Sequence, residues 1–217
     1  MSLRSMCKLG AALAVIALTA CVSGLNSKIP AKQIYVLEGA AGTPDAAGIA
    51  PAAAAPAVAP PSAADSLEVL MPSAAPGLER PDIAVLRPGQ RFDFYTNARW
   101  AVPAPSMLQS LVVDRLRDAQ RFSSVESDTG PFSAQYILSL ELQHFEAVYD
   151  ASGVPSVRVA LVCTLGRRTD RSVIASFTVR SEVRAEADRM QAVVAAFEQA
   201  SAQVLAQLAA DVVPPAP

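Results

Sequence analysis

Residues 39–64 are almost entirely alanine, proline and glycine. The stretch lacks the large apolar side chains that fill a core, and its prolines prevent a continuous helix. Such a composition is typical of a disordered or semi-extended linker. We therefore expect a linker or insertion over residues 39–65, a folded domain over residues 66–212, and a proline-rich tail at residues 213–217. A short strand at residues 34–38 either joins the sheet of this domain, with the linker as a surface insertion, or does not belong to the domain.

The start of the chain has the pattern of a bacterial signal peptide. Arg4 and Lys8 form a short positive region, and an apolar run over residues 9–20 follows it. Because a membrane span needs about 20 apolar residues, this run is too short to cross a bilayer. Residues 18–21 read Leu-Thr-Ala-Cys, the pattern processed in bacterial lipoproteins. We expect residues 1–20 to be a lipoprotein signal peptide.

Cys21 is the expected lipid attachment residue. A diacylglycerol on its sulfur and an acyl chain on its freed amine would be its bound groups, and the sequence points to no other cofactor. Two or more acyl chains hold a protein stably at a membrane. Residues 21–33 would form the lipidated tether. The alternative is an ordinary secretory signal with an incidental cysteine.

The residues after Cys21 bear on which membrane the protein occupies. An aspartate directly after the cysteine favours the inner membrane of enteric bacteria, but Val22 and Ser23 stand here. We therefore expect a lipid anchor at the periplasmic face of the outer membrane, with the inner membrane as the alternative.

Charge and cysteine content exclude several classes of protein. The formal net charge is −2 at pH 7, and a cleaved signal peptide would take two basic residues with it. This acidity argues against nucleic-acid binding, which requires clustered lysine and arginine. After cleavage only Cys163 would remain unacylated, so no intrachain disulfide is expected. Cys163 lies on the apolar side of a predicted strand, which favours a buried, inert thiol.

Hydrophobic periodicity predicts a domain of strands and two helices. Alternation with a period of two is clearest after residue 135, and a long apolar stripe marks the final helix. The pattern favours an α+β fold, a two-layer sandwich with a mainly antiparallel sheet and two helices packed on one face. Strands are expected at residues 34–38, 67–71, 83–86, 91–95, 136–142, 157–165 and 173–179, and helices at 106–119 and 185–212.

Motifs of catalysis are scarce. The only histidine is His144, and the sequence has no Gly-x-Ser-x-Gly elbow, no His-Glu-x-x-His motif and no glycine-rich phosphate loop. Glu146 could share a face with His144, but one histidine and one carboxylate make a poor metal site. We expect no catalytic, metal or cofactor-binding residues and favour a binding, adaptor or structural role.

After the lipoprotein cysteine, the sequence contains in a fixed order Tyr35 and Leu37, Arg80 and Pro81, Arg99 and Trp100, and Leu142 and Phe145. This ordered set of short motifs resembles the ABC-type transport auxiliary lipoprotein family, which includes the paraquat-inducible protein C group. The resemblance covers about residues 34–211, although the alanine- and proline-rich stretch is longer than the family pattern leads us to expect.

The resemblance implies a non-enzymatic component of a lipid transport system of the Gram-negative envelope. Such systems pair an ABC permease and ATPase with an MCE-domain substrate-binding protein, which the lipoprotein would dock at the outer membrane. A homo-oligomer, such as a ring capping the MCE assembly, would fit this role. Arg99 and Trp100 are tempting as interface anchors, but a tryptophan before a helix also serves as a core residue.

Two other functions stay open from the residues alone. The same fold would serve a structural or assembly lipoprotein of the envelope without a transporter. A periplasmic hydrolase would have to use His144.

Overall fold

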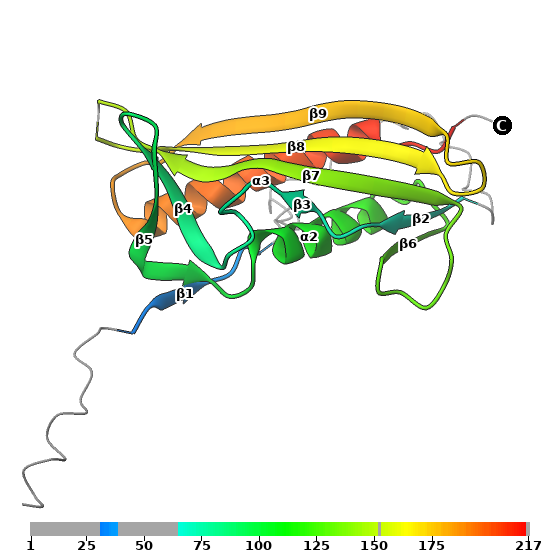
Figure 1. Cartoon of the computed structure of the whole chain (residues 1–217), viewed down its shortest axis with the longest axis horizontal. Coiled ribbons are helices and arrows are strands. Elements are labelled where there is room, and N and C mark those ends of the chain that lie inside the picture. Colours follow the sequence, from blue (N-terminus) through cyan, green and yellow to red (C-terminus); the bar gives the residue numbers. More distant parts are fainter. Residues whose placement is uncertain (1–30, 39–64, 152, 216–217) are drawn as a thin grey trace, which may run out of the picture. The chain divides into compact units, whose positions relative to one another are not determined.

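The computed structural model describes residues 31–38, 65–151 and 153–215. Within these residues a mixed sheet of nine strands carries two helices on one face (Figure 1). The expected α+β sandwich is therefore confirmed. All described elements belong to a compact unit that runs from Lys32 to Pro217. The expected signal peptide, Cys21 and the linker up to residue 64 lie outside the described residues.

The elements follow the chain in the order strands, helix, strands, helix. The strands are β1 (Gln33–Tyr35), β2 (Ser66–Val69), β3 (Ser73–Ala74), β4 (Asp82–Arg87), β5 (Arg91–Trp100), β6 (Ser124–Ser127), β7 (Tyr136–Val148), β8 (Ser156–Arg167) and β9 (Val173–Arg184), and the helices are α2 (Ala104–Asp118) and α3 (Met190–Asp211).

Strand β7 is the centre of the sheet. On one side it pairs antiparallel with β8, which pairs antiparallel with β9, and these are the longest ladders. On its other side β2, β3 and β4 pair with it in turn, all parallel, so residues 66–87 run alongside one strand in three segments. The parallel pairings add a mixed edge to the antiparallel meander that the sequence predicts.

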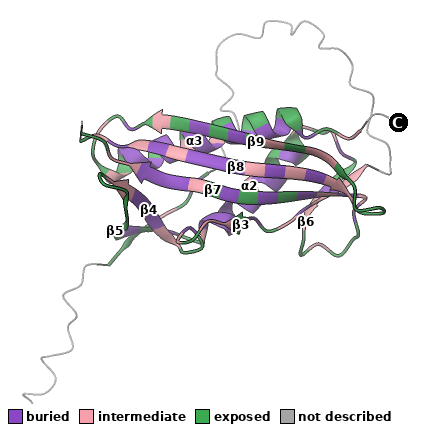
Figure 2. Cartoon of the chain, turned by 45° about the horizontal axis from the view of Figure 1, so that its top comes forward, coloured by how far each residue is buried: buried purple, intermediate pink, exposed green. Residues whose placement is uncertain are grey.

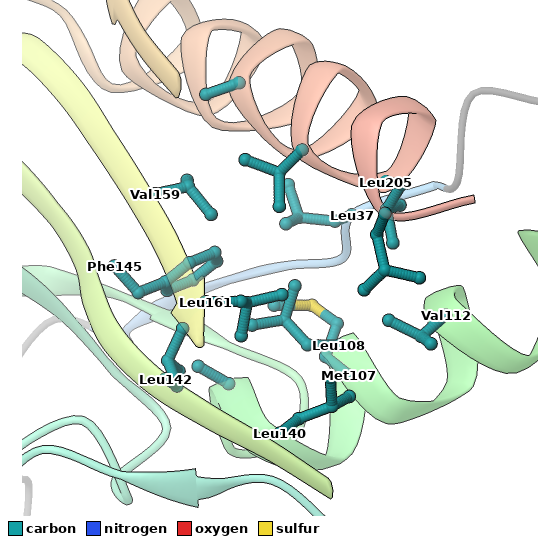
Figure 3. Close-up of a cluster of buried hydrophobic side chains, with 14 of the residues drawn as sticks. Leu37, Met107, Leu108, Val112, Leu140, Leu142, Phe145, Val159, Leu161 and Leu205 are labelled. Carbon is teal, nitrogen blue, oxygen red and sulfur yellow. The ribbon is translucent and has the colours of Figure 1, made fainter. Parts of the chain in front are cut away.

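The core lies between the sheet and the two helices. Alternate residues of β7 and β8 are buried, as the pattern of exposure along the strands shows in Figure 2. Figure 3 shows Leu108 of α2, Leu205 of α3 and Leu140 of β7 within one apolar cluster. Full burial of one such side chain contributes about 1.5–3 kcal/mol, so this layer is the main source of stability.

The short strand β1 joins the sheet beside the end of β5. It runs parallel to β5, with Ile34 opposite Arg99. The ammonium group of Lys32 lies 2.8 Å from a carboxylate oxygen of Asp82, and the side chain of Leu37 is buried in the core. Contacts on both sides of β1 therefore hold the segment in place.

Several elements differ from the sequence prediction, among them β3, which forms at residues 73–74 where no strand is expected. Strand β5 continues through Trp100, and β6 was not predicted. Helix α3 begins at Met190 rather than 185. Ala185, where the sequence predicts the start of the helix, instead donates its N–H to the carbonyl oxygen of Pro155. The pairing between β8 and β9 therefore continues to this residue.

Candidate functional site

Arg99 and Trp100, which the sequence suggests as interface anchors, lie in different environments. Arg99 is exposed on β5, whereas Trp100 is 1% exposed. The Trp100 ring packs against Phe145 of β7 and Phe197 of α3, with ring centroids 5.7 and 5.1 Å away. Trp100 is therefore a core residue that joins the two layers, and it is unable to contact a partner protein directly.

Cys163 is fully buried under α3, as its strand parity predicts. Burial raises the pKa of its thiol to about 12, so the thiolate is not formed at physiological pH. This cysteine packs as a small apolar side chain and has no catalytic role at its position.

His144 lies on the sheet face that is opposite to the helices. A β-bulge leaves Gln143 unpaired between Leu142 and His144. Because the extra residue resets the alternation, Phe145 turns into the core while His144 and Glu146 share the open face. His144 Nδ1 lies 2.8 Å from Glu146 Oε1, so the predicted pair forms.

Glu146 is a buried carboxylate with several partners. It is only 4% exposed, and its Oε2 accepts the backbone N–H of Phe145 at 2.7 Å. Arg158 of β8 approaches its Oε1 at 4.0 Å and reaches Glu182 of β9 at 3.8 Å. A buried carboxylate is stable only when it is paired and hydrogen-bonded, and this one has both kinds of partner.

A surface cleft of about 460 Å³ opens above these residues. It spans the three long strands, and the Arg180 side chain is exposed at its rim. Arg180 has no ion-pair partner among the described residues, so its charge is available to a ligand. The lining residues are His144, Arg158, Ala160, Arg180, Ser181 and Glu182.

The cleft lacks the geometry of nucleophilic catalysis. Ser181 is its one lining hydroxyl side chain, but that hydroxyl donates to Gln203 Oε1 of α3 at 2.6 Å. The Ser181 hydroxyl is therefore turned toward the helix layer and away from His144. Within the described ranges, no group of three or more acidic, histidine or cysteine residues could hold a metal ion.

The sequence indicated only half of this site. The pair of His144 and Glu146 could be found from their spacing. Arg158 and Arg180 are placed beside them by the strand register, in which Glu146 pairs with Arg158 and Ala160 pairs with both His144 and Arg180. No local sequence signal carries that register.

No helix within the part of the chain that the structure describes is both long and apolar enough to span a membrane.

Comparison with known proteins identifies relatives of the chain. The model of the ABC-type transport auxiliary lipoprotein component family matches residues 49–209. No curated protein matches the sequence. A crystal structure of a Xanthomonas campestris protein is similar with a TM-score of 0.65 and 29% identity, covering 81% of this chain and 92% of that one. A second crystal structure, of an uncharacterized protein, shares the fold with a TM-score of 0.60, at 16% identity and over 83% of this chain and 98% of that one.

Proposed function

Because the chain belongs to the ABC-type transport auxiliary lipoprotein family, we propose that it is the lipid-anchored, periplasm-facing auxiliary subunit of an ABC/MCE-type lipid transport system. In this role it docks the MCE-domain substrate-binding subunit at the outer membrane. The observation that carries the proposal is the family match over residues 49–209, which includes nearly every described element.

The anchor in this proposal is a diacylglycerol and an N-linked acyl chain on Cys21. The Leu-Thr-Ala-Cys sequence of residues 18–21 supports it, as does the small, polar tether that follows. These three acyl chains would hold the domain at the membrane without a transmembrane helix.

The cleft on the open face of the sheet is the proposed docking surface. Its walls are rigid because three long, paired strands carry them. Arg180 is an exposed cation without an ion-pair partner in the described chain, and arginine is favoured at interface centres. An acidic side chain of the MCE subunit would complete the pairing that the cleft leaves open.

The same geometry favours a non-enzymatic role over a hydrolase. His144 has a carboxylate partner but no nucleophile at hand, because Ser181 bonds to Gln203 on the helix side. A structural envelope lipoprotein without a transporter remains the second candidate, since the fold would serve it equally.

Affinity purification from detergent-solubilised, crosslinked membranes tests the proposal. We expect the tagged wild type to recover an MCE protein with its permease and ATPase. Arg180→Glu should lose them, while the control Arg115→Glu, on the exposed side of α2, should retain them. Native mass spectrometry of the purified complex would give the number of copies.

The outcomes separate the candidate functions. Absence of all transport subunits from the wild type would refute the transport role and leave the structural one. Equal recovery by both arginine variants would retain the transport role but exclude the cleft as the docking surface. Loss of envelope function in a folded His144→Ala variant that still recovers the subunits would favour a catalytic role.

A further inference from the structure

A second depression lies on the same sheet face, at the end formed by the β8–β9 turn. Its volume is about 350 Å³. The floor carries the hydroxyl groups of Ser139 and Thr164, which face each other across β7 and β8. Gly166 leaves the floor open because it has no side chain. Three arginines contribute to the lining, which consists of Ile137, Ser139, Thr164, Gly166, Arg167, Arg168, Arg171, Ser172 and Val173.

The three arginines differ in whether their side chains already have ion-pair or hydrogen-bond partners. Arg168 donates to the carbonyl oxygen of Ala134 at 2.9 Å and pairs with Glu68, so it is a structural residue. Arg167 faces Asp170 at 3.6 Å. Arg171 is exposed and has no partner within the described residues. The pocket therefore keeps one unpaired positive charge beside two hydroxyl groups.

The backbone conformation of the turn does not favour arginine at position 171. Its φ is +57°, in the left-handed region where glycine and asparagine are favoured.

Two large apolar side chains are exposed at the same end. Phe132, in the loop between β6 and β7, is 75% exposed, and Val173 is 66% exposed. The bond from Arg168 to Ala134 ties this loop to the β8–β9 turn, and Figure 1 shows both at one end of the sheet. An exposed phenylalanine and an unpaired arginine at the same end of a domain are a combination found where proteins enter a membrane interface.

We propose that this end of the sheet binds the phosphate headgroup of an anionic phospholipid in a bilayer surface. Arg171 and the two hydroxyl groups contact the phosphate, and Phe132 and Val173 enter the boundary of the acyl chains. The exposed apolar pair favours a lipid over free phosphate, because a dissolved anion would not cover it. The inference is independent of the docking of an MCE subunit.

Flotation with vesicles tests it on the chain from Val22 onward. This chain lacks the acylated cysteine but keeps every described strand and helix. It is mixed with vesicles of phosphatidylcholine alone or with added phosphatidylglycerol. We expect binding to the phosphatidylglycerol vesicles that weakens as salt rises.

Two variants probe the two halves of the site. Arg171→Asn should weaken binding about five-fold, since one basic residue near an anionic surface contributes about 1 kcal/mol. It should not harm folding, because asparagine suits the left-handed turn. Phe132→Ser should weaken binding about ten-fold. Arg115→Glu, on α2, is the matched control and should bind as the wild type does.

The results that would overturn the proposal are specific. Equal binding of both vesicle types, or wild-type binding by Arg171→Asn, would exclude recognition of the headgroup. Binding of inorganic phosphate in a direct titration without any binding of vesicles would assign the pocket to a free anion. Because neither the anchor nor a transport subunit is present, these results leave the proposed function untouched.

Discussion

Replacing Phe197 by alanine should produce the largest loss of stability among the substitutions considered for this domain. Phe197 projects from the middle of α3 and is fully buried. Its ring centroid lies 5.1 Å from that of Trp100 and 4.9 Å from that of Phe145. The side chain therefore connects α3 to both β5 and β7.

The expected loss in the free energy of unfolding is about 4–5 kcal/mol. Truncation of a buried phenylalanine typically costs about 3–5 kcal/mol, including the cavity that it leaves. Each lost aromatic pair contributes about 0.5–1.5 kcal/mol beyond burial, which places this residue in the upper part of the range. Phe197→Leu keeps most of the volume but loses both ring pairs, so about 1.5–2 kcal/mol is expected.

Urea denaturation of the chain from Val22 onward measures these losses. Trp100 is the only tryptophan in the sequence, so its fluorescence reports directly on the cluster. Phe92→Ala is the matched control, because Phe92 is 42% exposed, and its loss should stay near or below 1 kcal/mol. If Phe197→Ala were no more destabilising than Phe92→Ala, the argument that this cluster joins the layers would be refuted.

Three further predictions concern other parts of the domain. Hydrogen bonding by Lys32 lowers the pKa of Asp82, so the pairing stabilises β1 above about pH 4 and this contribution fades as the pH falls through the folded pKa. Asp82→Asn should therefore speed hydrogen exchange in β1 at pH 7, with the difference from wild type disappearing in acid; a constant difference would contradict this. In the chain from Val22 onward, Cys163 should react with a thiol reagent only after denaturation, and rapid labelling of the native protein would show that its burial is transient. Gly77 has a φ of +93°, so Gly77→Ala should lower the free energy of unfolding by about 1 kcal/mol in urea titrations, whereas an unchanged midpoint would mean that the turn relaxes.

The central part of the fold could be predicted because its elements are long and strictly periodic. The alternation in β7 and β8 and the stripe on α3 match the burial that the structure shows. The short elements could not be found in this way. Strand β6 has four residues and its sequence, Ser-Val-Glu-Ser, has one apolar side chain. It forms because β2 offers it a parallel partner.

Only the part of the candidate site that depends on local residue spacing could be predicted from the sequence. His144 and Glu146 are two residues apart, so their shared face was visible from the sequence, whereas the bulge at Gln143 decides that this face is the open one. Val173 is exposed, whereas the apolar alternation of its strand predicts that it lies on the inner face of the sheet. The register shifts between Leu165 and Gly166, so Val173 comes to lie at the rim of the β8–β9 turn.

The parallel edge of β7 has a consequence for the order in which this domain can fold. Leu67 pairs with Tyr136, and Ala84 pairs with Glu146, so residues 66–87 are synthesised well before the strand that they join. Contacts so distant in sequence make folding slow. The core is also incomplete until α3 forms, because Phe197 and Leu208 of this helix are part of it. A chain with this topology cannot complete its core until its C-terminal helix has been made.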